Sequence, residues 1–141
     1  FLSLADRDKA VGLSAALRFV QLGFAIAATP GTADYLEANG VPVLTRVRKL
    51  GESGPGTDAV ELISGGKVDL VVNSPRGRGP RADGAYIRTA ASVNRVPCLT
   101  TAAAALAAAN GMADWAAHEL RVRSLQEYHE GIHGDQLRLP L

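Results

Sequence analysis

The clearest sign of the fold is the stretch Gly65-Gly66-Lys67-Val68-Asp69-Leu70-Val71-Val72-Asn73. The two glycines favour the end of a helix, and the apolar, β-branched run after them is typical of a strand. We therefore predict a strand over Val68–Asn73. Because this run is apolar on both faces, it indicates a strand in the interior of a parallel sheet rather than one at its edge.

Strand-like and helix-like segments alternate along the chain on both sides of that stretch. The other predicted strands are short and apolar, and they are Phe1–Ala5, Phe24–Ala28, Val43–Val47 and Cys98–Thr100. The predicted helices cover Ala10–Leu22, about Ala33–Ala38, the segment from Asp58 to Gly65, Gly84–Asn94 and the alanine-rich run after Thr101. Asp58 and Glu61 have the spacing of a capping box, and Thr100-Thr101 can cap the alanine-rich helix. This alternation predicts a three-layer α/β fold with a mostly parallel, five-stranded sheet flanked by helices. A last short strand is predicted over Val122–Leu125.

The amino-acid composition excludes several classes of protein to which this chain could belong. The chain has 141 residues, a formal net charge of +1, 47% hydrophobic residues and a single cysteine, Cys98. One cysteine excludes an internal disulfide and a cysteine-based zinc cluster, and the near-neutral charge argues against a dedicated nucleic-acid binder. No signal peptide or membrane span is visible. We expect a cytoplasmic protein with one domain over residues 1–130 and a disordered tail over 131–141. The first residue, Phe1, favours a piece of a larger protein.

Ligands of parallel sheets bind at the carboxyl ends of the strands, so the residues that follow the strands are candidates for a site. The turn Thr29-Pro30-Gly31-Thr32 places two hydroxyls at the start of a helix, where free amides and the helix dipole favour an anion such as phosphate. An ordinary threonine cap explains the same turn equally well. Three cations in or near other strand-end loops would complete a positive pocket of phosphate size, and they are Lys9, Arg48 and Lys49.

Other polar side chains near the strand ends allow a functional and a structural interpretation. Asn73 can contact a polar ligand or hold a loop, and Asp58 and Asp83 can form an acid–base pair or cap the helices that follow. The loop arginines fit a solvated surface better than an RNA contact, because no aromatic residue among them could stack on bases. These arginines are Arg76, Arg78 and Arg81. The histidines show no metal-ligand spacing and are His118, His129 and His133.

Several segments resemble a known family in their order and spacing. They are Ala28-Thr29-Pro30-Gly31-Thr32-Ala33, residues 65–73, Asp83-Gly84-Ala85-Tyr86-Ile87-Arg88 and Val96-Pro97-Cys98-Leu99-Thr100-Thr101. Together they are similar to the methylglyoxal synthase-like domain, and more narrowly to the C-terminal allosteric domain of the carbamoyl phosphate synthase large subunit. The resemblance runs from about Ser3 to His129, and Val122-Arg123-Ser124-Leu125-Gln126-Glu127 also resembles the closing segment of that subunit.

The resemblance implies a regulatory domain with no catalytic residues of its own. Such a domain binds effectors such as UMP, IMP or ornithine and regulates carbamoyl phosphate synthesis for pyrimidine and arginine biosynthesis. The phosphate would lie on the positions of two lysines and two threonines, and an asparagine and two serines would line the rest of the pocket. The implied effector-binding residues are Ser3, Lys9, Thr29, Thr32, Lys49, Asn73 and Ser74.

The resemblance also implies partners and cofactors beyond this chain. The partners would be upstream synthetase domains of the same polypeptide and a glutaminase small subunit, and a homo-oligomer is compatible with this arrangement. ATP, Mg²⁺ and K⁺ would act in the upstream catalytic part, an ATP-dependent ligase, and this domain would hold no cofactor or metal. Neither nucleic acid nor a membrane is expected as a partner.

Two other functions are compatible with parts of the sequence. Ser53-Gly54-Pro55 and Asp58 resemble the phosphate loop and catalytic aspartate of methylglyoxal synthase, a lyase acting on dihydroxyacetone phosphate, and Asp83 resembles its second acid. However, Ala5 and Pro80 stand where that enzyme has histidines, so no imidazole would polarise the substrate carbonyl. The other alternative is an RNA-binding module that uses the three loop arginines.

Overall fold

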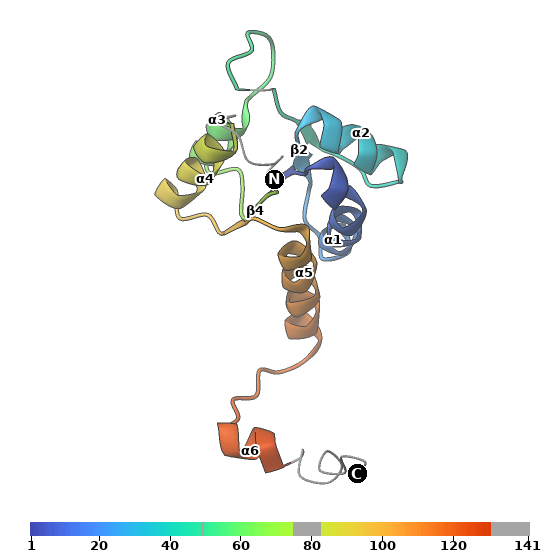
Figure 1. Cartoon of the computed structure of the whole chain (residues 1–141), viewed down its shortest axis with the longest axis vertical. Helices are drawn as coiled ribbons and strands as arrows, with labels where there is room; N and C mark the ends of the chain where they lie inside the picture. Colours follow the sequence, from blue (N-terminus) through green and yellow to red (C-terminus); the bar gives the residue numbers. More distant parts are fainter. Residues whose placement is uncertain (49, 75–82, 131–141) are drawn as a thin grey trace, which may run out of the picture.

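A computed structural model of the chain contains a parallel sheet between two layers of helices (Figure 1). It describes residues 1–48, 50–74 and 83–130. The five strands lie in the order β3-β2-β1-β4-β5, and all their pairings are parallel. The strands are β1 (Leu2–Ser3), β2 (Ala27–Ala28), β3 (Thr45–Arg46), β4 (Val71–Asn73) and β5 (Cys98–Leu99). The predicted fold class is confirmed, and β4 lies inside the sheet as expected.

Helices connect successive strands and continue beyond the last one. They are the 3-10 helix η1 (Asp6–Asp8) and the α-helices α1 (Lys9–Gln21), α2 (Pro30–Ala38), α3 (Ala59–Ser64), α4 (Asp83–Val93), α5 (Ala102–Ala117) and α6 (Leu125–Glu130). Several of the predicted helix signals are confirmed. Asp58 and Glu61 form a capping box at the start of α3, and the Thr101 hydroxyl accepts a hydrogen bond from the Ala104 amide at the start of α5.

Two apolar cores, one on each face of the sheet, hold the layers together. The first lies between the sheet and helices α1, α2 and α5, where small residues such as Ala16 and Ala105 are fully buried. Gly12 belongs to the same close packing, because a Cβ atom there would lie 2.3 Å from Leu4 Cδ1. The second core lies between the sheet and helices α3 and α4, around Ile63 and Val71. Each face therefore has its own buried layer.

The strands are shorter than predicted, and the segment before β2 shows why. Residues Phe24–Ile26 were expected to be extended strand, but the Phe24 amide donates to the Phe19 carbonyl oxygen. The Phe24 ring packs edge-on against Phe19, with 5.9 Å between the ring centroids. These contacts tie residue 24 to the end of α1, and the strand β2 begins only at Ala27.

The prediction of a strand over Val122–Leu125 is wrong, because a helix starts there. The Ser124 hydroxyl accepts a hydrogen bond from the Glu127 amide, and the Glu127 carboxylate accepts one from the Ser124 amide at 2.6 Å. This reciprocal cap starts α6, which projects with the end of α5 away from the sheet (Figure 1). The predicted tail over 131–141 lies outside the described residues.

Candidate functional site

Parallel pairing brings the carboxyl ends of three neighbouring strands to one edge. Leu2 is in register with Ala28, and Ser3 is in register with Asn73. The residues that follow therefore emerge together, and their backbones remain bonded beyond the ladder: Thr29 N donates to Leu2 O, and Ser74 N donates to Ser3 O at 2.9 Å. Four of the predicted ligand residues thus share this edge, namely Ser3, Thr29, Asn73 and Ser74.

Thr32, a predicted ligand residue, also links two elements of the scaffold. Its side chain is fully buried, and its Oγ1 accepts a hydrogen bond of 2.9 Å from the backbone amide of Leu4. The Thr29 hydroxyl donates to the same oxygen at 3.1 Å. Thr29 is the N-cap residue of α2, but its side chain makes no capping bond within the helix. The two hydroxyls therefore join α2 to the segment that leaves β1.

Asn73 and Ser74 are also buried and bonded to the scaffold. Ser74 Oγ accepts a hydrogen bond of 2.8 Å from the backbone amide of Ala5. Asn73 Nδ2 donates to the carbonyl oxygen of Gly84 at 3.1 Å and so fixes the first turn of α4. A Cβ atom at Gly84 would lie 3.2 Å from that same Nδ2. In the structure, Asn73 therefore anchors the first turn of α4.

Lys9 occupies an unusual position for a cation. It is the first residue of α1, where the positive end of the helix dipole disfavours a positive charge. Its side chain is only 18% exposed, and its Nζ lies 2.7 Å from Asp6 Oδ1. The same Nζ lies 5.8 Å from the centroid of the Tyr35 ring on α2. The ammonium therefore lies between the start of α1 and the Tyr35 ring on α2.

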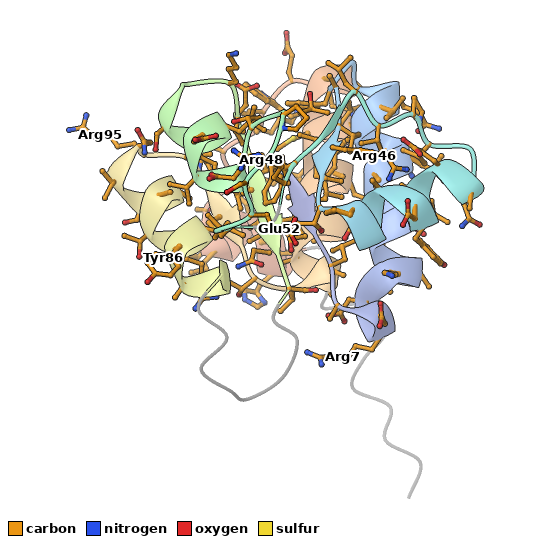
Figure 2. All side chains as sticks on the ribbon, turned by 90° about the horizontal axis from the view of Figure 1, so that it is seen from above. Arg7, Arg46, Arg48, Glu52, Tyr86 and Arg95 are labelled. Atoms are coloured by element: carbon orange, nitrogen blue, oxygen red, sulfur yellow. The ribbon has the colours of Figure 1, made fainter. Side chains whose placement is uncertain are left out.

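Two of the cations predicted for the phosphate pocket, Arg48 and Lys49, follow β3. Lys49 lies outside the described residues. The Arg48 guanidinium bonds to the loop that follows it. Its Nε donates to Gly56 O at 2.9 Å, and a second nitrogen donates to Glu52 O. The third nitrogen lies 3.5 Å from the Glu61 carboxylate. Figure 2 shows Arg48 and Glu52 close together beside this loop. Arg48 thus shapes the loop, and nothing in these bonds assigns it to a phosphate pocket.

Of the two acid–base candidates, Asp58 caps a helix, and the side chain of Asp83 lies outside the described part of the structure. Both the Asp58 carboxylate and the Glu61 carboxylate are used in the capping box of α3, in bonds of 2.9 and 3.1 Å. Asp83 is the first residue of α4, but its side chain lies outside the described part, as do Pro80 and the loop arginines. Ala5, two residues after β1, is buried. Burial raises the pKa of the Cys98 thiol, which disfavours the reactive thiolate.

The remaining candidates show no metal or membrane chemistry where the structure describes them. Within residues 1–48, 50–74 and 83–130, no group of three or more histidine, cysteine, aspartate or glutamate side chains could hold a metal ion. His118 pairs with Asp114 at the exposed end of α5, far along the chain from the strand ends, and His129 is exposed. His133 lies outside the description. Among the described helices, none is both long and apolar enough to span a bilayer.

Two residues of this site were missed by sequence reasoning, namely Asp6 and Tyr35. A signal for each was present: Asp6 stands three residues before Lys9, and Tyr35 stands three residues after Thr32, one turn along α2. What was missing was the packing of α1 against α2, which brings Lys9 to the Tyr35 ring.

Comparisons with known proteins agree with the observed fold. A family model described as "MGS-like domain" matches residues 12–100. The carbamoyl phosphate synthase large chain of Streptomyces avermitilis is 47% identical over 135 residues, and that of Rubrobacter xylanophilus is 46% identical over 130 residues. That of Mycobacterium tuberculosis is 42% identical over 139 residues. The matches cover 94%, 92% and 95% of this chain, but only 12% of each relative. The chain thus spans about one eighth of these relatives.

Proposed function

This chain belongs to the MGS-like domain family, and on that premise we propose that it is the effector-binding, regulatory part of a carbamoyl phosphate synthase large chain. Its effector is a nucleoside monophosphate, UMP first, with IMP and ornithine as further candidates. Binding would regulate carbamoyl phosphate synthesis for the pyrimidine and arginine pathways. The similarity to large chains over 92–95% of this sequence supports the assignment to that protein.

The observation that carries the proposal is the placement of Lys9. A mostly buried cation at a helix N-terminus is disfavoured by the dipole and by desolvation, so a protein gains from it mainly when an anion binds there. Thr29 stands nearby along the same edge, at the N-terminus of α2. Its hydroxyl donates to Thr32 in the structure, and a hydroxyl can rotate to donate to a phosphate oxygen instead.

The other parts of the ligand follow from the same edge. The phosphate would lie against Lys9, Thr29 and Thr32, with Lys49 as a second cation. The ribose and base would extend over the ends of β1 and β4, where Ser3, Asn73 and Ser74 emerge. Asn73 and Ser74 already bond to Gly84 and Ala5, so they would form the wall of this part of the pocket.

In the proposed function, this chain would work within a larger enzyme. The partners would be the upstream synthetase domains of the same polypeptide and a glutaminase small subunit, in the cytoplasm. ATP, Mg²⁺ and K⁺ would belong to the upstream part, and the effector would be the only small molecule bound here. An effect on synthesis requires that the effector bind one conformation of the whole enzyme more tightly than another.

Calorimetric titration of the chain with UMP, IMP, ornithine and uridine tests the proposal. We expect saturable binding of UMP and at least tenfold weaker binding of uridine, because uridine lacks the phosphate. Lys9→Met should weaken UMP binding by about tenfold or more, since a charge-assisted hydrogen bond contributes about 1.5–3 kcal/mol and about 1.4 kcal/mol corresponds to a factor of ten.

The matched control is Lys67→Met, which removes an exposed lysine before β4, at the opposite end of the strands. This variant should bind UMP within about twofold of the wild type. Equal affinity for UMP and uridine, or equal losses in the two lysine variants, would refute a phosphate site at Lys9.

We further propose that the isolated chain is not an enzyme. Ala5, two residues after β1, offers no proton donor to a triose carbonyl, and Asp58 is engaged in a helix cap. The chain should therefore form no methylglyoxal from dihydroxyacetone phosphate above a buffer control. Turnover that disappears in Asp58→Asn would instead establish the lyase.

A further inference from the structure

The contacts of Lys9 divide into two kinds with different consequences for a ligand. Asp6 contributes a full negative charge 2.7 Å from the ammonium. Tyr35 contributes the negative face of an uncharged ring, 5.8 Å from Nζ to the centroid, within the usual range of a cation–π contact. An ammonium has three N–H donors, and a ring face attracts it without accepting a conventional hydrogen bond. The ring can therefore stay in place while an anion binds.

The two partners also differ in their surroundings. The side chain of Asp6 is 85% exposed, whereas that of Lys9 is 18% exposed. An ion pair with so exposed a carboxylate is weak. The ring lies on α2, whose first turn carries Thr29 and Thr32. Residues three apart on a helix share a face, so Tyr35 and Thr32 lie on neighbouring turns of the same side.

We propose that Tyr35 is a positioning residue that holds the Lys9 ammonium against α2, one turn beyond Thr32, and that Asp6 is its exchangeable counter-ion. A phosphate monoester then takes the place of the Asp6 carboxylate, while the ring keeps the ammonium in position. This inference rests on the proposed function, because it deepens the account of the same anion site. It adds a residue that fixes geometry and a residue that lowers affinity.

Substitutions of Tyr35 and Asp6 should change the affinity for UMP in opposite directions. Tyr35→Leu removes the ring face and should weaken UMP binding by about fivefold, whereas Tyr35→Phe keeps the face and should bind within about twofold of the wild type. Asp6→Asn removes the competing charge and should tighten UMP binding by about two- to fivefold at low ionic strength, with a smaller gain at high salt.

A double-mutant cycle separates positioning from folding. Tyr35→Leu in the Lys9→Met background should cause no further loss of UMP affinity, because the ring then has no ammonium to hold. The methylene protons of Lys9 next to Nζ give an independent readout by NMR: a nearby ring should shift them upfield in the wild type and in Tyr35→Phe, and the shift should vanish in Tyr35→Leu. Thermal unfolding of each variant verifies that it folds.

Each outcome of these titrations has a definite meaning. A loss in Tyr35→Leu that persists in the Lys9→Met background, or that Tyr35→Phe shares, would show a purely structural role and overturn the inference. Unchanged binding in Tyr35→Leu would overturn it as well, while leaving the proposed function intact. If the wild type shows no saturable binding of UMP, the proposed function fails, and this inference fails with it.

Discussion

At the scale of single residues, polar side chains at the candidate edge serve the scaffold before they serve a ligand. Where β1 leaves the ladder, two consecutive amides need new acceptors. The Leu4 amide finds Thr32 Oγ1 at 2.9 Å and the Ala5 amide finds Ser74 Oγ at 2.8 Å. One hydroxyl comes from α2 and the other follows β4, so the two bonds fix three segments relative to one another. A ligand at this edge would meet a preorganised surface.

The buried bond of Thr32 leads to a prediction about stability. Thr32→Val keeps the shape but leaves the Leu4 amide without its acceptor, which should lower the free energy of unfolding by about 1–3 kcal/mol. Thr32→Ser keeps the hydroxyl and should lose clearly less. Urea unfolding of the three proteins gives the comparison, and equal stability of the valine variant and the wild type would contradict the assigned role.

Two glycines in helices lead to a second prediction, because their substitution by alanine should change the stability in opposite directions. Gly12→Ala would place a Cβ 2.3 Å from the fully buried Leu4 side chain, so we expect a loss of about 1–3 kcal/mol through overpacking. Gly111 lies in α5 with nothing within 4 Å of its would-be Cβ. Gly111→Ala should therefore gain about 0.5–1 kcal/mol from helix propensity. Thermal unfolding measures both, and a neutral Gly12→Ala would mean that Leu4 can move aside.

Residue types predicted much of the edge, but not which side chains contact one another. Hydroxyls, an asparagine and cations after strand ends could be found from the sequence, because parallel strands end at one edge. The hydrogen bond from the Leu4 amide to Thr32 could not be predicted from the sequence, since it depends on the distance between β1 and α2. The same is true of Tyr35, whose ring reaches Lys9 only through the packing of two helices.

At the scale of elements, local signals were reliable where they satisfy the backbone within a few residues. The capping box of α3 and the threonine cap of α5 formed as predicted, because each joins residues only three apart. Strand ends were less predictable. Phe24 has the composition of a strand residue, yet a contact with Phe19 at the end of α1 keeps it out of the ladder.

Helix α6 leads to a prediction about pH. Two hydrogen bonds from Ser124, first from its amide and then from its hydroxyl, lower the pKa of the Glu127 carboxyl below its ordinary value. A carboxyl with a depressed pKa in the folded helix stabilises it above the ordinary pKa, and that contribution is lost as the pH falls through the depressed value. We expect α6 to lose order on acidification.

NMR measures this effect directly. The amide signals of Ser124 and Glu127 should move together with the carboxyl titration of Glu127. In Ser124→Ala the carboxyl should titrate nearer to its ordinary pKa, because both the hydroxyl bond and the cap are weakened. An unchanged Glu127 titration in that variant would contradict the cap.

At the scale of the whole molecule, strand order depends on contacts that no local pattern contains. The alternation of segments predicted the parallel sheet and its five strands, and the apolar run at residues 68–72 predicted an interior strand. The order β3-β2-β1-β4-β5 places the first strand at the centre. That position is stabilised by two neighbours distant in sequence, since Leu2 pairs with both Ala28 and Val72.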